Sequence, residues 1–525
     1  MEVMWSTDVL IAVLLIVATS PLLYSLWGIF NMMWLTPRRA KRIFEAQGFT
    51  CLPFRFLFGN LPELGSIMLE THSRPMSHIS HDIGRHAFPY YYRWTEQYGD
   101  RCVYFHGSEA RTFLSNPVQL KEVLSTKFSQ YPRLLRRPDM VNIVDDAVLQ
   151  LDGERWALHR RILNPGFFVE KLKAMVPTMA ACTMDMLERW NLPMGESREV
   201  DVAQEFRTLS ADIIANTAFG SSYKEGIQIF ELQQEQLRLA LRISRTIYIP
   251  GKRFLPTSFN RHCWKVEKQI AEVICQMINK RLLESSTVDS GDRYGNDLLG
   301  LLISAMKNES TGNGKKMTIG ITDIIGECKT FFLAGHETTA TLLSWTFFLL
   351  AVHSEWQERV REEVQAVCGL SNPPTVDALN QLKLAAMVLN ESLRLYPPAA
   401  VMTRKTNRDT KLGKITIPEG TVLMLPILAM HHDARYWGPD VNEFRPERFS
   451  DGIGKACRVP GAFMPFSLGP RVCIGQAFTF LEAKVVLSAL LQRYRFQVSP
   501  EYKHSPVYML TLQPQYGVPL VVERI

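Results

Sequence analysis

A ten-residue segment near the C-terminus places the strongest constraint on this chain. Residues 466–475 read F-S-L-G-P-R-V-C-I-G, so glycine and proline prevent regular structure until a helix begins near Gln476. Cys473 therefore directly precedes a helix N-terminus, where unpaired backbone N–H groups and the helix dipole favour a thiolate. Arg471 adds positive charge that suits an anionic cofactor group, and the glycines let a flat cofactor approach the backbone. The segment predicts a soft metal ligand at Cys473, with a buried loop cysteine as the simpler alternative.

The other cysteines and the overall composition exclude several classes of protein. The chain has 525 residues and nine cysteines at irregular spacing, with no C-x-x-C pair, which argues against a disulfide scaffold or a zinc ribbon. Eight of these cysteines lie in apolar or helical contexts and are best interpreted as small buried apolar residues. A hydrophobic content of 46% and a net charge of +7 exclude a disordered chain, and no basic stripe indicates nucleic acid as a partner.

The N-terminal region predicts a membrane anchor. Residues 9–37 carry no formal charge and are long enough to span a bilayer as a helix. The basic cluster that follows (Arg38, Arg39, Lys41 and Arg42) places the rest of the chain in the cytosol. A cleaved signal peptide is the alternative, but the basic n-region is missing and the apolar run is too long. We expect an anchor over residues 1–37, a basic and proline-containing linker over 38–62, and one globular body over 63–525.

Hydrophobic periodicity predicts a mainly α-helical body with a minor β component. Amphipathic helices cover about residues 172–302, with one break at 249–251, and a largely apolar helix covers 321–352. A further helix over 375–396 should stop at Pro397-Pro398. The segments 421–427 and 507–512 predict strands, and the polar stretches 285–296 and 308–316 predict loops.

Two pairs of polar residues lie in apolar helical surroundings. Glu391 and Arg394 are i and i+3 on one helix, so their side chains are neighbours, as in many exposed surface pairs. Glu337 and Thr338 interrupt the apolar run, where a carboxylate is costly unless it is solvated or paired. A core helix with one exposed edge would also explain the second pair.

Four motifs together resemble the cytochrome P450 family of haem-thiolate monooxygenases. The pattern F-x-x-G-x-R-x-C-x-G resembles the haem-binding loop of that family. Residues 391–394 (E-S-L-R), 446–449 (P-E-R-F) and 334–339 (A-G-H-E-T-T) resemble three further signatures, in the order that the family has. The resemblance covers essentially the whole chain after the anchor, and it implies the P450 fold preceded by one N-terminal transmembrane helix.

The resemblance implies haem b (iron protoporphyrin IX) as the cofactor, with Cys473 as the ligand to the iron. Matching residues of the family bind the haem propionates. This maps the role onto a W-x-x-x-R pair, onto the arginine of the cysteine loop and onto a basic residue on the strand after the helix of Glu391 and Arg394. These residues are Trp156, Arg160, Arg471 and Arg404. A guanidinium suits the task because its fork matches a carboxylate bidentately.

The resemblance also assigns roles to the polar pairs. Thr338 would open the helix hydrogen bonding locally and, with Glu337, deliver protons through water for dioxygen activation, while Gly335 would leave room for the oxygen. Glu391, Arg394 and Arg448 would form a partly buried triad with a structural role, in which loss of one partner leaves an uncompensated charge.

The implied reaction is hydroxylation of a hydrophobic or amphipathic small molecule. Electrons would come from NADPH through NADPH–cytochrome P450 reductase, because the chain has no G-x-G-x-x-G that opens a helix after a strand. A basic group formed by Arg155, His159, Arg160 and Arg161 is a candidate contact for an acidic redox partner. The implied location is the endoplasmic reticulum membrane, with a cytosolic catalytic domain.

The substrate class stays open at this level. Segments 210–214, 219–222, 327–332 and 513–517 are similar to the plant clan of cytokinin hydroxylases, brassinosteroid- and gibberellin-inactivating enzymes, triterpenoid oxidases and fatty-acid hydroxylases. By position in the family, the pocket would be lined from 133–148, 230–249, 331–332, 401–402 and 508–510. Two alternatives remain: a haem-thiolate isomerase or lyase that acts on peroxides, disfavoured by the Glu337-Thr338 pair, and a non-catalytic haem-binding protein.

Overall fold

The computed structural model describes residues 19–21, 23–133, 147–220, 223–285, 293–308 and 318–525. The predicted lining segment 133–148 and the two predicted polar loops lie largely outside these ranges. The body is mainly helical with small sheets, as the periodicity predicts.

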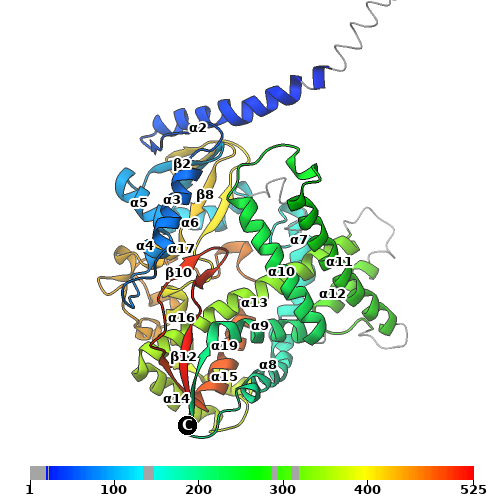
Figure 1. Ribbon diagram of the computed structural model, residues 1–525, viewed down its shortest axis with the longest axis vertical. Coiled ribbons are helices and arrows are strands. Elements are labelled where there is room, and N and C mark those ends of the chain that lie inside the picture. Colours follow the sequence, from blue (N-terminus) through cyan, green and yellow to red (C-terminus); the bar gives the residue numbers. More distant parts are fainter. Residues whose placement is uncertain (1–18, 22, 134–146, 221–222, 286–292, 309–317) are drawn as a thin grey trace, which may run out of the picture.

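The long apolar run folds as one central helix, α13 (Ile321–Val352), which crosses the middle of the molecule (Figure 1). Its first turn is closed by a hydrogen bond from the Gly320 N–H to Asp323 Oδ2 at 2.8 Å. The helix is apolar on nearly all sides, and such a helix must be buried by neighbours on all sides. These neighbours include α9 (Val202–Phe219), α16 (Lys383–Leu395) and α19 (Gln476–Leu491).

Further helices surround this centre and agree with the predicted helical middle of the chain. They are α7 (Gly153–Leu163), α8 (Val169–Trp190), α10 (Tyr223–Ser244), α11 (Ser258–Glu284), α12 (Leu298–Asn308) and α14 (Ser354–Cys368). The predicted break at 249–251 lies between α10 and α11, where Pro250 and Gly251 follow the end of α10.

The prediction of one helix over 375–396 is wrong in one respect. The structure divides it into α15 (Val376–Gln381) and α16, with Leu382 between them at ψ 89°. Glu363 of α14 explains the break, because its carboxylate accepts the first backbone N–H groups of α16. The distances are 2.7 Å from Lys383, 2.7 Å from Leu384 and 2.9 Å from Ala385. A carboxylate at this position also interacts favourably with the positive end of the helix dipole.

The main sheet has five strands in the order β1-β2-β3-β8-β5. The strands are β1 (Thr50–Cys51), β2 (Cys102–His106), β3 (Glu109–Phe113), β8 (Val422–Leu425) and β5 (Met402–Lys405). Strand β8 lies within the predicted strand 421–427. The smaller sheets are β4-β12-β9 (Ser197–Asp201, Pro519–Arg524 and Tyr494–Val498) and the hairpin β6-β7 (Thr410–Leu412 and Ile415–Ile417).

The predicted strand 507–512 is instead a hairpin. Strand β10 (Pro506–Tyr508) pairs antiparallel with β11 (Leu512–Pro514), and the chain reverses between them. The Met509 N–H donates to the Thr511 carbonyl at 3.2 Å within the turn. The Leu512 N–H donates to the Pro398 carbonyl at 3.0 Å, which attaches the second strand to the end of α16.

The described part of the N-terminal region is helical. Residues 23–45 form a helix with a π-helical turn, η1 (Asn31–Leu35), that leads into α2 (Thr36–Glu45). In Figure 1, α2 lies along the body beside the main sheet, and the part of the helix before it extends away from the body. Residues 1–18 and 22 of the predicted anchor lie outside the described ranges. Within those ranges, no helix combines the length and the apolar character that crossing a bilayer requires.

Candidate active site

The cysteine segment forms an irregular loop that ends at a helix, as its glycines and proline predict. A 3₁₀ turn, η11 (Gly469–Arg471), precedes Cys473, and α19 begins at Gln476. The Cys473 N–H donates to the Phe466 carbonyl at 2.9 Å, which closes the loop. Gly469 has φ +72°, and a Cβ there would lie 2.4 Å from the Leu124 carbonyl oxygen, so this position requires glycine.

Cys473 is the exposed one among the nine cysteines, although its thiol lies deep among protein atoms. Burial raises the pKa of the Cys473 thiol, and the backbone N–H of Gly475 and the charges of Arg160 and Arg133 oppose this rise. The nearby positive charge therefore comes from Arg160 and Arg133. Arg471 was expected to supply it, but Arg471 is turned towards Asp152 instead.

Three arginines from distant parts of the chain gather around Asp152. Asp152 Oδ1 accepts a hydrogen bond from Arg471 Nη2, and Asp152 Oδ2 accepts one from the Arg133 backbone N–H at 3.2 Å. Arg404 lies on β5, and the next residue, Lys405, donates its N–H to the carbonyl of Pro132 at 3.0 Å. That bond holds the segment of Arg133 beside the strand of Arg404.

This cluster carries more positive charge than Asp152 neutralises. Burial, together with repulsion from Arg133 and Arg471, lowers the pKa of Arg404 to about 9. Burial likewise lowers the pKa of Arg133 to about 10. Each arginine has one buried nitrogen without a hydrogen-bond partner among the described residues: Arg404 Nη2, Arg133 Nε and Arg471 Nη1. Buried donors of this kind require an anionic acceptor, and the two propionates of a haem fit them in charge and in hydrogen bonding.

Helix α7 positions two more of the predicted residues beside the loop. The guanidinium of Arg471 lies over the ring of Trp156, 4.6 Å from its centroid. Arg160 Nη1 donates to the Val472 carbonyl at 3.0 Å, and its Nε donates to Asn164 Oδ1 at 2.9 Å. Arg160 thus holds the backbone next to Cys473, and Trp156 covers one face of Arg471.

The predicted basic group on α7 does not form one surface. His159 is buried, and its Nδ1 lies 2.6 Å from Glu327 Oε1 on α13. Arg160 is turned inward, as described above, whereas Arg155 and Arg161 are exposed. Arg155 also pairs with Asp323 at 2.6 Å.

Thr338 lies on an accessible strip of the otherwise buried α13. Ala334, one turn earlier, is exposed, and Thr338 is half-buried. Thr338 Oγ1 donates to the Ala334 carbonyl at 2.8 Å. The helix continues without a break through this motif, so the expected local opening is not observed.

The carboxylate of Glu337 points away from the Thr338 strip, because adjacent helical residues are about 100° apart. Glu337 is buried, and its Oε1 accepts hydrogen bonds from Thr511 Oγ1 at 3.2 Å and from Gln513 Nε2. Its Oε2 lies 3.8 Å from Arg207 Nε and 3.6 Å from His336 Nε2. No motif connects these partners with Glu337, and segment 513–517 is similar to the plant clan without indicating this contact.

Gly335 has a packing role in the structure, and its expected role beside the oxygen stays a prediction. A Cβ at this position would lie 2.8 Å from Ile214 Cγ1 and 2.9 Å from Ile214 Cδ1, on α9. The glycine therefore allows α13 and α9 to approach each other, and the direction of its missing side chain is towards α9.

The structure brings Glu391, Arg394 and Arg448 together. Glu391 and Arg394 are fully buried and form a bidentate pair, with both N–O distances 2.7 Å. Arg448 Nε lies 3.5 Å from Glu391 Oε1, and Arg448 Nη2 lies 2.8 Å from Asp440 Oδ2. Asp440 is a further member that the motif spacing did not indicate.

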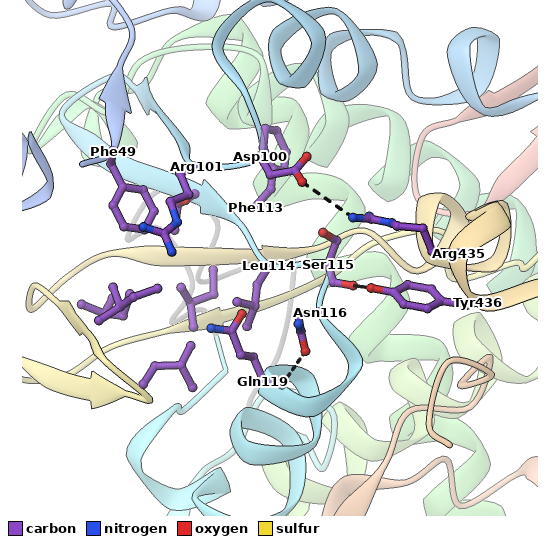
Figure 2. A pocket seen from close by; sticks show the side chains of 15 residues that line it. Phe49, Asp100, Arg101, Phe113, Leu114, Ser115, Asn116, Gln119, Arg435 and Tyr436 are labelled. Atoms are coloured by element: carbon purple, nitrogen blue, oxygen red, sulfur yellow. Dashed lines mark hydrogen bonds and ion pairs between the residues drawn. The ribbon is translucent and has the colours of Figure 1, made fainter. Parts of the chain in front are cut away.

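A pocket of about 240 Å³ lies elsewhere, beside β3, β8 and the β6-β7 hairpin (Figure 2). Asp100 and Arg435 form an ion pair of 4.0 Å at its rim, and the Tyr436 hydroxyl donates to the Ser115 carbonyl at 3.5 Å. It contains none of the residues that the sequence singled out, so it is separate from the site around Cys473.

Comparison with known proteins identifies the family. A sequence model described as Cytochrome P450 matches residues 75–519. The chain belongs to the cytochrome P450 family. Among its relatives, Cytochrome P450 CYP72A616 from Paris polyphylla is 42% identical over 496 residues, which are 94% of this chain and 95% of the relative. Cytochrome P450 734A1 from Arabidopsis thaliana is 39% identical over 500 residues, 94% of each chain.

Two further similarities support this assignment. The 7-deoxyloganic acid hydroxylase of Catharanthus roseus is 38% identical over 521 residues, 98% of this chain and 99% of the relative. The solved structure of retinoic acid-bound cyanobacterial CYP120A1 superposes with a TM-score of 0.70 at 22% identity, over 83% of this chain and 94% of that one, which shows the fold. The chain is thus a plant P450 monooxygenase with haem as its cofactor.

Proposed function

We propose that this P450 hydroxylates a hydrophobic or amphipathic small molecule, such as a plant hormone, a fatty acid or a terpenoid. The observation that carries the proposal is the solvent-accessible residue Cys473 beside a buried cluster of arginines with surplus positive charge. One relative carries the name of a hydroxylase of 7-deoxyloganic acid, a reaction of the proposed type.

In this proposal, the chain's own residues bind the cofactor and orient it. Cys473 ligates the iron, and Arg404, Arg471 and Arg133 bind the propionates with the nitrogens that lack partners. Trp156 covers Arg471, and Arg160 holds the loop at Val472. The bound haem supplies the oxidising chemistry, in which dioxygen is split, one atom enters a C–H bond and the other becomes water.

The proton chemistry is assigned to α13. The hydroxyl of Thr338 faces the accessible strip at Ala334, where it can hold and pass on a proton through water. The carboxyl group of Glu337 lies 3.8 Å from Arg207, whose side chain is 29% exposed, so it can exchange protons with solvent on that side. The triad of Glu391, Arg394 and Arg448 has a structural role, because its buried ion pairs join α16 to the segment of Arg448.

We also propose NADPH–cytochrome P450 reductase as the electron donor and the endoplasmic reticulum membrane as the location. Arg155 and Arg161 on α7 are exposed near the cysteine loop and offer positive charge to an acidic partner. Exposed apolar side chains favour a membrane contact, among them Trp27 in the N-terminal helix and Phe254 and Leu255 after α10. Release of the protein from microsomes by carbonate washing would contradict the anchored location.

The test of the proposed function begins with the spectrum of the reduced, CO-bound protein. We expect a thiolate-ligated haem, and we expect Cys473→Ser to lose that spectrum. A spectrum of histidine-ligated haem in the unaltered chain would overturn the assignment of Cys473.

Turnover assays then separate the reaction classes. Fatty acids, terpenoids and plant hormones are screened for a spin shift, and hits are incubated with reductase and NADPH. A hydroxylated product that requires both supports the proposal. Conversion of a peroxide without NADPH indicates an isomerase or lyase, and no conversion by either route indicates a non-catalytic haem protein.

A further inference from the structure

The strongest unassigned feature is the contact between the hairpin β10-β11 and the carboxylate of Glu337. Thr511 lies directly before β11 and Gln513 lies on it. Both side chains donate to the same atom, Glu337 Oε1. They are also joined to each other, since Gln513 Nε2 lies 3.2 Å from Thr511 Oγ1. Thr511 is buried and Gln513 is half-buried.

The backbone of the hairpin is fixed to the same helix that carries Glu337. Trp345 Nε1, two turns further along α13, donates to the Leu512 carbonyl at 2.7 Å. The Leu512 N–H in turn donates to the Pro398 carbonyl at 3.0 Å. Leu512, between Thr511 and Gln513, is thus hydrogen-bonded through both its carbonyl and its N–H. The two donors beside it therefore keep a fixed position relative to α13.

The two oxygens of Glu337 consequently have different surroundings. Oε1 accepts two hydrogen bonds from donors that bear no charge and cannot take up a proton at neutral pH. Oε2 faces Arg207 and His336 at 3.8 Å and 3.6 Å, beyond hydrogen-bond distance, and Arg207 reaches solvent. A proton can therefore be exchanged at Oε2 without breaking a hydrogen bond, whereas protonation of Oε1 would displace a donor.

We infer that Gln513, together with Thr511, is a positioning residue that restricts proton exchange of Glu337 to Oε2. The inference rests on the proposed role of Glu337 in proton delivery. The turn that joins the two strands carries Met509 and Leu510, each 41% exposed, so the element that holds the acid also presents apolar side chains. Loss of the donors would let the carboxylate rotate and would misdirect proton delivery.

The test measures hydrogen peroxide formed per NADPH, using full-length holoenzyme with reductase and no added substrate. With two electrons, NADPH and a proton reduce dioxygen to hydrogen peroxide, whereas four electrons and correctly delivered protons yield two waters. We expect Gln513→Leu to retain the reduced CO spectrum and to raise peroxide per NADPH about threefold or more, because the hydrogen bond that holds Glu337 Oε1 is lost. We expect the double variant with Glu337→Gln to match Glu337→Gln alone, since both changes act on one carboxylate.

Gln515→Leu is the matched control. Gln515 lies just after the same strand and bonds to the His72 carbonyl and to Ser505, without contacting Glu337. We expect its peroxide yield to equal that of the unaltered enzyme. An equal rise in Gln515→Leu would show general loosening of the hairpin and overturn the inference.

The remaining outcomes are also decisive. If Gln513→Leu behaves as the unaltered enzyme while Glu337→Gln does not, the inference fails and the proposed function stands. If Glu337→Gln has no effect, the proposed proton role itself fails. If Gln513→Leu loses haem, Thr511→Val is measured instead, and loss of haem in both would show a structural role and overturn the inference.

Discussion

Arg471 illustrates how a side chain near a functional residue acquires its role from partners far away in the chain. It lies two residues before Cys473, yet its guanidinium bonds to Asp152 and to the Leu151 carbonyl and lies over Trp156. Arg160, which is distant in sequence, takes the position nearer the thiol. Spacing along the chain therefore indicated arginines that the structure brings together, but not the contacts that each of them makes.

Thr338 leads to a prediction at the same scale. We expect Thr338→Ala to retain haem and to lower product per NADPH about tenfold or more, because positioned proton transfer typically contributes two or more orders of magnitude. Thr338→Ser should keep most of the coupling, since it retains the hydroxyl that now donates to Ala334. Product and NADPH are measured together with a compound identified in the spin-shift screen, and equal coupling in Thr338→Ala would refute the role.

At the scale of elements, the contact between α13 and α9 depends on one glycine. A methyl group at Gly335 would approach Ile214 within 2.8 Å, closer than two carbon atoms can pack. We expect overpacking in Gly335→Ala to lower the free energy of unfolding of the holoenzyme by about 1–3 kcal/mol. The higher helix propensity of alanine offsets about 1 kcal/mol of this loss. Thermal unfolding measures the effect.

Two further variants test the cause of that change. Ile214→Ala combined with Gly335→Ala should be more stable than the sum of the single changes, because it removes the clash. Gly65→Ala in α3 (Leu61–His72) is the control, since a Cβ there meets no atom within 4 Å, and we expect slight stabilisation. Gly335→Ala that stabilises as Gly65→Ala does would contradict the packing explanation.

At the scale of the whole molecule, buried histidines make stability depend on pH. Burial lowers the pKa of His81 and of His431 to about 3, and that of His504 and of His86 to about 4, from the ordinary 6.5. The folded chain keeps these rings neutral while the unfolded chain protonates them below 6.5. Stability therefore falls as pH drops from 6.5 towards 4, by about 1.4 kcal/mol per pH unit for each histidine.

We expect His81→Gln to reduce the fall in melting temperature between pH 7.5 and pH 5.5, because glutamine cannot take up a proton. His78→Gln should leave that fall unchanged, since His78 is exposed. If the unaltered enzyme, His81→Gln and His78→Gln all show the same fall in melting temperature, the acid destabilisation has an origin other than His81. The measurement is thermal unfolding of the holoenzyme at the two pH values.

Local chemistry explains what the sequence alone determined. The cysteine loop, the start of α19 near Gln476, the apolar α13 and the pairing of Glu391 with Arg394 all depend on residues within a few positions of each other. Glycine, proline and helical periodicity act over such short distances, so the sequence is sufficient to predict them.

Contacts between distant segments were decided by the tertiary structure. Glu363 on α14 caps the start of α16 twenty residues away, and the backbone N–H of Arg133 donates to Asp152. Gln513 meets Glu337 only because the hairpin docks on α13. Each of these contacts gives a donor its acceptor, and the two meet only when the whole chain is packed, so no pattern of neighbouring residues could indicate them.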